Sequence, residues 1–234
     1  MLKHLFYALL FLAPALNSAG VKISEPIILT KPIEKKPNLY EAMKLETFGL
    51  AHQVLELALQ GHKKLAADGK LENPNILTIV DFSQSSRNKR MYVLDLESQT
   101  MVHHSLVAHG RNTGDEFAKN FSNIDGSWQS SLGFYVTRGT NMGASVGFSL
   151  IVEGLEKGFN DNAQRRQIIV HGAEYATENF IQRTGRLGRS FGCPAVPPEN
   201  IRPIVNTIQN GTCLFIYFPD DTYLNSSNIL NNPV

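Results

Sequence analysis

One stretch governs both the architecture and the chemistry of this chain: IIVHGAEYATENFIQRTGRLGRSFGCPAV, residues 168–196. It begins with three β-branched residues, which predict a strand, and His171 follows them directly. It ends with Cys193 between a glycine and a proline. A free cysteine has a pKa near ~8.5 and is mostly protonated at neutral pH, so a nucleophilic thiol needs a neighbouring base. His171 is the candidate base and Cys193 the candidate nucleophile.

Glycines approach this cysteine at positions 185, 188 and 192. Because glycine has no side chain, the backbone near it can come close to a substrate carbonyl. We expect the amides of Gly192 and Cys193 to form an oxyanion hole, in which one donor is typically worth ~3 kcal/mol. Pro194 removes one competing donor and fixes the backbone after the cysteine.

The pattern resembles the active-site signature of the L,D-transpeptidases, the YkuD-like murein enzymes, in the residues His171-Gly172 and Arg189-Ser190-Phe191-Gly192-Cys193-Pro194-Ala195. The likeness is to the branch whose motif reads G-R-S-x-G-C-P-A, and it spans residues 75–219. In the commoner form of the family the segment is Ser/Thr, His, Gly, Cys, an aliphatic residue and Arg. Here Phe191 replaces the second histidine and Ala195 the arginine. Arg189 or Arg186 is the candidate substitute for holding the substrate carboxylate.

The resemblance implies a mainly β fold with a few helices, a β-sandwich catalytic domain preceded by an N-terminal helical segment. It also implies a reaction without a cofactor. Such enzymes cleave a peptidoglycan tetrapeptide stem after the L-centre of diaminopimelate, release the terminal D-alanine and transfer the acyl group to an amine. The acceptor amine belongs to another stem peptide or to a wall-anchored protein. The Gly172 carbonyl would orient the His171 imidazole, in place of the acid of a triad.

Four further residues are expected near the substrate. The segment Ser130–Tyr135 resembles the T-P-x-G-x-F element of the family, which leads into the next strand, and it places Tyr135 near the site. Arg189 is expected to meet a carboxylate bidentately, with Ser190 beside it. His109 ends a β-like run and is a candidate to face the cleft. The alternatives are an exposed loop charge for Arg189, a turn residue for Ser190 and a structural hydrogen bond for His109.

Length and charge limit the class of protein. The 234 residues suffice for one domain of ordinary size, and the formal net charge of +1 gives no reason to expect a nucleic-acid partner. Residues 1–19 resemble a secretory signal, with Lys3, a short apolar run and small residues. The apolar run is shorter than the ~20 residues that span a bilayer. We therefore expect export to the periplasm or cell envelope without a remaining membrane anchor, the alternative being an uncleaved one.

Other uses of the two cysteines stay open. In an exported protein Cys193 and Cys213 could form a structural disulfide, and the chain would then be a non-catalytic wall-binding module. His109, His171 and Cys193 could in principle bind zinc, but no zinc motif is present and we expect no metal. Within the same chemistry water could accept the acyl group. The protein would then be an L,D-carboxypeptidase, or an endopeptidase that detaches wall-bound protein.

The rest of the chain is predicted from periodicity and turn residues. Residues 20–73 form a linker and an amphipathic helix, with helical spacing over 39–67 and a break at Gly49. Residues 74–220 form the catalytic domain, and residues 221–234 form a frayed polar tail. A short helix capped by Asn160 or Asp161 is also expected. The remaining helix is predicted over residues 199–208. The predicted strands are 76–82, 90–94, 100–108, 149–153, 168–170 and 212–218.

Overall fold

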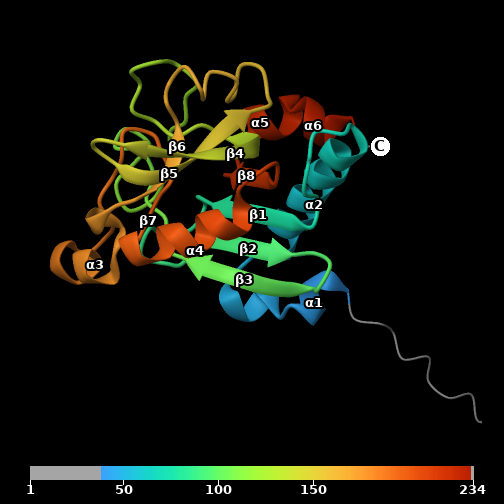
Figure 1. Cartoon of the computed structure of the whole chain (residues 1–234), viewed down its shortest axis with the longest axis horizontal. Coiled ribbons are helices and arrows are strands. Elements are labelled where there is room, and N and C mark those ends of the chain that lie inside the picture. The colour runs from blue at the N-terminus through green and yellow to red at the C-terminus, as the bar shows by residue number, and fades with distance from the viewer. Residues whose placement is uncertain (1–37, 233–234) are drawn as a thin grey trace, which may run out of the picture. The chain divides into compact units, whose positions relative to one another are not determined.

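The computed structural model describes residues 38–232 (Figure 1). The predicted signal at residues 1–19 and the linker up to residue 37 lie outside the described residues. The strands are β1 (Ile76–Asp81), β2 (Met91–Asp95), β3 (Thr100–Ser105), β4 (Gly133–Gly143), β5 (Gly147–Gly154), β6 (Ile169–Gly172), β7 (Ala195–Val196) and β8 (Cys213–Tyr217). The helices are α1 (Leu39–Ala42), η1 (Leu45–Phe48), α2 (His52–Ala67), η2 (Glu174–Ala176), α3 (Glu178–Thr184), α4 (Pro198–Ile208), α5 (Asp221–Ser226) and α6 (Asn228–Asn231).

The eight strands form one hydrogen-bonded sheet in the order β3-β2-β1-β8-β4-β5-β6-β7. β1 pairs with β8 in parallel, as β6 does with β7, and the other neighbours are antiparallel. Figure 1 shows β1–β3 and β4–β6 as two parts of this sheet, with β8 between them. The mainly β fold with a few helices, preceded by a helical segment, is confirmed. The strands form one hydrogen-bonded sheet that is continuous through β8. The prediction described this sheet as a β-sandwich.

The sheet is covered on both faces in its middle. Every residue of β1 and of β8 is buried, and successive side chains of a strand point to opposite faces, so both faces must be covered. α2 packs on β1 and β8, and its buried positions recur with helical spacing. α4 contacts β1, β5 and β6. The glycine expected to interrupt the first helical segment does so, since Gly49 adopts φ +82 at the end of η1.

α4 begins and ends where the sequence predicts. Pro198 stands in its first turn, where proline is tolerated, and the helix runs to Ile208. Ile201, Ile204 and Val205 are buried on one face together with Ile208. Because α4 follows β7 directly and contacts β6, its packing holds the strand that carries His171.

The prediction of a frayed polar tail over 221–234 is wrong for residues 221–231, which form α5 and α6. The Asp220 side chain caps α5 at the Tyr223 amide, and the Ser227 side chain caps α6. Tyr223 and Ser227 both donate to the carboxylate of Glu156. A few buried apolar groups and two caps thus hold a segment whose composition is mostly polar.

The short helix expected near Asn160 is also absent, because residues 159–167 form turns. Asn160 is fully buried, and its side-chain amide donates to the carbonyls of Leu132 and Phe134. Its side-chain oxygen accepts from the Glu156 amide at 2.8 Å. Asn160 therefore ties this turn to the start of β4.

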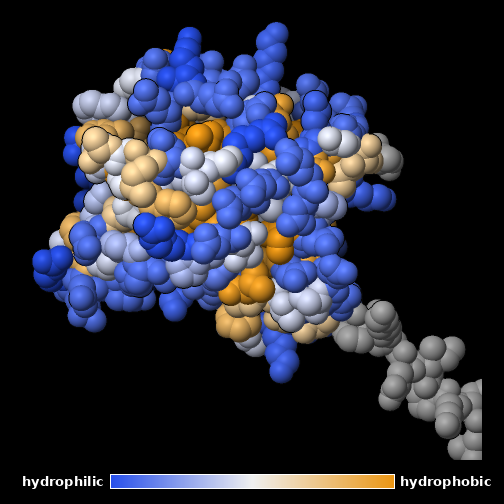
Figure 2. Space-filling view, viewed as in Figure 1, coloured by the Kyte–Doolittle hydropathy of each residue, from blue (hydrophilic) through white to orange (hydrophobic). Residues whose placement is uncertain are grey.

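The surface seen in Figure 2 is mostly hydrophilic, with apolar residues in scattered patches. Among residues 38–232 no helix combines the length and the apolar character that crossing a bilayer requires.

Candidate active site

The two residues of the predicted nucleophile–base pair line one cavity. His171 lies on β6, between β5 and β7, where it is in register with Ser149 and Ala195. Cys193 lies in the loop that leads into β7. The cavity has a volume of about 490 Å³ and is called the thiol cavity below. It is lined by Ser145, Val146, His171, Gly172, Ala173, Glu174, Tyr175, Ser190, Phe191 and Cys193.

The His171 ring is fixed by its own neighbour. Its Nδ1 lies 3.0 Å from the Gly172 carbonyl oxygen, so Nδ1 carries the proton and donates to that oxygen. The opposite nitrogen, Nε2, is then free to accept a proton. Burial lowers the pKa of His171, and the hydrogen bond to Gly172 opposes this effect. The imidazole is therefore neutral at pH 7, as a general base must be.

The surroundings of Cys193 favour the protonated form of its thiol. Burial raises its pKa, while the Ile169 amide and the charge of Arg166 act in the opposite direction. Its Sγ donates to the Gln167 carbonyl oxygen at 3.7 Å. No hydrogen bond joins this sulfur to the His171 ring in the described part of the chain. Reaction with the imidazole thus requires the thiol to turn from Gln167 toward the cavity.

Arg166 is a charged neighbour of the thiol that the sequence analysis did not select. Its guanidinium donates to the carbonyls of Ser122 and Gln129, both at 2.6 Å, and to the Ser127 hydroxyl at 3.1 Å. These bonds hold a positive charge beside Cys193. The only signal in the sequence was a pair of arginines just before the β6 strand, a pattern that is common on protein surfaces.

Ser190 shapes the loop before the cysteine, in agreement with the alternative of a turn residue. Its hydroxyl donates to the Cys193 carbonyl at 2.6 Å and accepts from the Gly192 amide at 3.0 Å. Its amide donates to the His109 carbonyl. Ser190 lines the thiol cavity, but its polar atoms are occupied by backbone.

The expectation that the Gly192 amide forms part of an oxyanion hole is wrong, because that amide is bonded to Ser190 and Gly192 is buried outside the cavity lining. Glycine is required at this position by the backbone conformation instead. Its φ is +128, and a Cβ there would lie 2.8 Å from the Gln129 carbonyl oxygen. The Cys193 amide makes no hydrogen bond to another residue of the described chain and is the remaining donor of the predicted pair.

Arg189 and Tyr135 do not face the thiol cavity, contrary to the prediction. Arg189 donates to the Asp115 carboxylate at 2.7 Å and to two backbone carbonyls. Tyr135 is fully buried and donates to the Ser131 carbonyl at 3.1 Å, and burial raises its pKa. The element that resembles the family does lead into a strand, β4, but Tyr135 falls on a face of that strand that belongs to the core.

His109 is structural and does not face the cavity, so its predicted site role is wrong. The ring is 1% exposed and its Nδ1 accepts from the Arg90 guanidinium at 2.8 Å. The other ring nitrogen lies 3.3 Å from the Gly114 carbonyl oxygen. Burial, with the Arg90 charge, lowers the pKa of His109 to about 3.

The cavity has a second set of members that the sequence did not indicate. Tyr175 and Glu174 come from η2. Tyr175 packs over Gly188, and a Cβ added at Gly188 would lie 2.4 Å from the Cβ of Tyr175. Burial raises the pKa of Tyr175 to about 12, and a nearby Cys193 contributes. Phe191 is 62% exposed and forms part of the rim. Short turns between strand and helix carry no periodicity, which is why Glu174 and Tyr175 were missed.

The structure does not support the alternatives for the two cysteines. Both are free thiols. Cys213 is fully buried in β8, and burial raises its pKa. No group of three or more His, Cys, Asp or Glu side chains among residues 38–232 is arranged to hold a metal ion.

The chain is similar in sequence to one known family. A model described as L,D-transpeptidase catalytic domain matches residues 46–217, more than half of the chain. A search of curated proteins found no match.

The solved structures that this chain resembles are distant from it in sequence. An L,D-transpeptidase from Mycobacterium smegmatis is 12% identical over 62% of this chain and 59% of its own, with a TM-score of 0.38. One from Mycobacterium tuberculosis is 14% identical over 62% of this chain and 58% of its own, with a TM-score of 0.37. A fused Zn-dependent amidase/peptidase/peptidoglycan-binding domain-containing protein from Clostridium acetobutylicum is 15% identical over 70% and 62%, with a TM-score of 0.38. The chain thus spans less than two thirds of the length of these structures.

Proposed function

The chain belongs to the L,D-transpeptidase catalytic domain family, and we propose that it is an exported, cysteine-dependent murein L,D-transpeptidase. Its donor substrate is a peptidoglycan tetrapeptide stem. Its acceptor is an amine of a second stem peptide or of a wall-anchored protein. The observation that supports this proposal is that Cys193 and the His171 ring, which is held by the Gly172 carbonyl, line the same cavity.

In the first half-reaction the Cys193 sulfur attacks the carbonyl carbon at the L-centre of diaminopimelate. The thiol proton passes to Nε2 of His171 as the C–S bond forms. The Cys193 amide donates to the developing oxyanion. The C–N bond to the terminal D-alanine then breaks, and the imidazolium returns its proton to the leaving amine. The products are a thioester on Cys193 and free D-alanine.

In the second half-reaction the acceptor amine attacks the thioester carbon. A C–N bond forms while the C–S bond breaks, and the sulfur leaves as thiolate. His171 accepts a proton from the attacking nitrogen and passes it to the sulfur, which restores the thiol. The result is a new amide bond and the free enzyme.

Arg166 and Gly172 act through other residues and are positioning residues in this scheme. The Arg166 charge beside Cys193 favours the thiolate, which opposes the effect of burial. The Gly172 carbonyl fixes which His171 nitrogen carries the proton. The first effect raises the fraction of Cys193 that is thiolate, and the second raises the fraction of His171 whose Nε2 can accept the thiol proton.

The test is turnover of purified muropeptides with a tetrapeptide stem, followed by mass spectrometry. Cys193→Ala should abolish both D-alanine release and crosslink formation while the circular dichroism spectrum stays unchanged. The matched control is Cys213→Ala, which should retain substantial activity because that thiol is buried in β8 away from the cavity. Undiminished turnover by the folded Cys193→Ala variant contradicts the proposal. Products with a trimmed stem, or a released anchor protein, would assign the acceptor to water.

A further inference from the structure

The reaction proposed above places a negatively charged oxygen in the thiol cavity. The Cys193 amide is one hydrogen-bond donor to that oxygen. The Gly192 amide cannot be the second, because it is bonded to the Ser190 hydroxyl at 3.0 Å. Donors that are aimed in advance at the point where the charge develops usually supply the largest part of the rate in such reactions. A further donor in the lining of this cavity is therefore of catalytic interest.

Four side chains of the thiol cavity can donate a hydrogen bond, namely Ser145, His171, Tyr175 and Ser190. The Ser190 hydroxyl is bonded to backbone on both sides, and the His171 ring donates through Nδ1 to the Gly172 carbonyl. Ser145 is exposed in the turn between β4 and β5, where water competes for its hydroxyl. The Tyr175 hydroxyl is half-buried and has no hydrogen-bond partner in the described part of the chain. It is the donor that remains.

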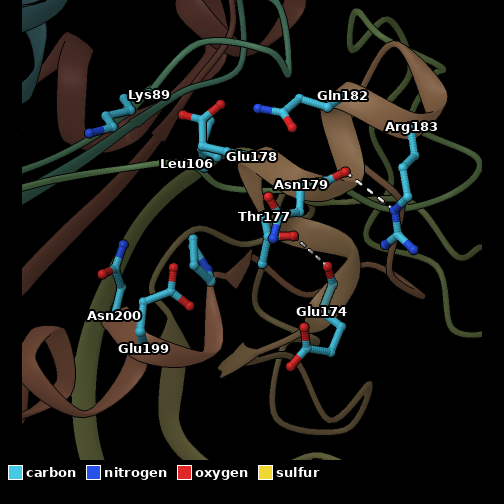
Figure 3. A pocket seen from close by; sticks show the side chains of 11 residues that line it. Lys89, Leu106, Glu174, Thr177, Glu178, Asn179, Gln182, Arg183, Glu199 and Asn200 are labelled. Atoms are coloured by element: carbon cyan, nitrogen blue, oxygen red, sulfur yellow. Dashed lines mark hydrogen bonds between the residues drawn. The ribbon is translucent and has the colours of Figure 1, made fainter.

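Tyr175 is held firmly by its surroundings. It is the middle residue of η2, and the Thr177 hydroxyl closes this turn on the Glu174 carbonyl at 2.9 Å, as the dashed line in Figure 3 shows. The Tyr175 carbonyl accepts from the Gly188 amide at 2.7 Å. Its side chain packs against the small apolar cluster that includes Leu187. The ring thus needs little rearrangement to donate, which is what a preorganised donor requires.

The Tyr175 phenol also responds to charge on the sulfur. Burial raises the pKa of Tyr175 to about 12, and the Cys193 charge acts in the same direction. The phenol therefore keeps its proton at the pH at which the thiol reacts. Because a charge on the Cys193 sulfur acts on this phenol, a negative oxygen on the carbon bonded to that sulfur would act on it as well.

We propose that Tyr175 is a catalytic residue, whose hydroxyl donates a hydrogen bond to the oxyanion beside the Cys193 amide. This inference rests on the proposed function, because the oxyanion forms only when Cys193 attacks the acyl carbonyl. As the C–S bond forms, the π electrons of the carbonyl move to its oxygen and the thiol proton passes to Nε2 of His171. The Tyr175 proton stays on the phenol oxygen. The same contact recurs when the acceptor amine attacks the thioester.

The experiment compares a reaction of Cys193 that forms an oxyanion with one that does not. Acylation of the full chain by a muropeptide with a tetrapeptide stem is followed by the first turnover of D-alanine release and by the mass of the acyl-enzyme. Alkylation by iodoacetamide displaces iodide from a saturated carbon, so no oxyanion arises. The variant is Tyr175→Phe, which keeps the ring. The control is Tyr40→Phe, a half-buried tyrosine on α1 that does not line the thiol cavity.

We expect Tyr175→Phe to lower the acylation rate at saturating donor by about 10²- to 10³-fold, the range for loss of one oxyanion donor. The KM for the donor should change by less than about threefold, because the contact strengthens only as the charge develops. The alkylation rate and its dependence on pH should equal those of the wild-type chain. Tyr40→Phe should equal the wild-type chain in both reactions.

Three results would overturn the inference. The first is acylation by the folded Tyr175→Phe variant within about threefold of the wild-type rate. The second is an equal slowing of acylation and alkylation, since the hydroxyl would then act on the thiol and not on the oxyanion. Both leave the proposed function intact, because the wild-type acyl-enzyme still forms. Failure of the wild-type chain to form any acyl-enzyme is the third, and it overturns the proposed function together with this inference.

Discussion

The reactivity of Cys193 depends on neighbours that lie far from it in the sequence and near it in space. Burial alone would keep the thiol protonated, because it raises the pKa. The Ile169 amide and the Arg166 charge oppose this effect on the pKa, and the His171 imidazole is the group that would accept the thiol proton. His171 was predictable, since a histidine after a strand and a cysteine in a glycine-rich loop form a recognisable pair. Arg166 was not, because its role depends on how residues 122–131 fold around its guanidinium.

Substitution of Arg166 should change the titration of the thiol. In the wild-type chain we expect the rate of Cys193 alkylation by iodoacetamide to rise with pH through a midpoint above the ordinary cysteine pKa, since burial is the largest effect. In Arg166→Gln the midpoint should rise further, and the alkylation rate at pH 8 should fall by about threefold to tenfold, up to one pKa unit. Residue-resolved mass spectrometry measures both.

Two variants accompany this measurement. Arg166→Lys keeps the charge and should recover part of the rate. Arg165→Gln removes the exposed neighbouring arginine and should leave the profile unchanged. A folded Arg166→Gln variant with the wild-type midpoint would show that the charge does not act on the sulfur.

His109 should make the fold sensitive to acid. Its pKa is about 3 in the folded chain and near ~6.5 when unfolded. Between these values the unfolded chain binds a proton that the folded chain does not, so the free energy of unfolding falls as pH decreases from ~6.5 toward 3. In His109→Gln the loss between pH 7 and pH 4.5 should be smaller by up to about 3 kcal/mol. Urea unfolding at the two pH values measures it.

The matched control for this prediction is His52→Gln, because His52 is exposed on α2. That variant should lose the same stability on acidification as the wild-type chain. An identical loss in His109→Gln and the wild-type chain would mean that His109 is not the acid-sensitive group.

At the scale of helices and strands, the sequence predicted elements better than the faces they present. Strands β1, β2 and β8 and helix α4 lie where β-branched runs and helical spacing place them. Which side of a strand faces a site depends on the elements that pack on each face of the sheet. The sequence of the strand itself does not say which elements these are. Tyr135 was therefore assigned to the site, although its side chain is fully buried and its hydroxyl donates to the Ser131 carbonyl. The tail helices were missed because their caps and their few apolar residues are spread among asparagines and serines.

α2 contains a glycine whose replacement tests its packing. A Cβ at Gly61 would lie 2.0 Å from the Phe134 ring, which is stacked on Phe215 at 4.2 Å between centroids. Alanine in a helix is normally better than glycine by ~1 kcal/mol. Here we expect Gly61→Ala to destabilise the chain by about 1–3 kcal/mol, because the ring must move in a packed core. Urea unfolding gives the difference.

Gly139→Ala is the comparison, since nothing lies within 4 Å of a Cβ at that position. It should change stability little. A Gly61→Ala variant more stable than the wild-type chain would refute close packing of α2 on β4.

At the scale of the whole molecule, the final helices complete a buried polar centre. The Glu156 carboxylate accepts from the Phe134 amide at 2.7 Å and from Tyr223 at 2.9 Å, and Ser227 donates to it as well. Removal of residues 221–234 takes away two of these three donors and exposes apolar core. We expect a loss of about 3–5 kcal/mol in the free energy of unfolding, the scale of a buried charge left without partners. Urea unfolding of the two chains measures it.

A chain that ends at Asn232 controls for shortening as such, because it keeps α5 and α6. It should unfold at the same urea concentration as the full chain. Equal stability of the chain that ends at Asp220 would show that the tail helices contribute nothing to the core.

The place of β8 has a consequence for biosynthesis. This strand is the last of the eight described strands to be made, yet it stands in the middle of the sheet and pairs with both β1 and β4. The parallel partner of β1 therefore lies more than a hundred positions further along the chain, and the middle of the sheet is completed only after nearly all of its other strands have been made. Loss of the last strand would therefore leave β1 and β4 each with an unpaired edge in the middle of the sheet.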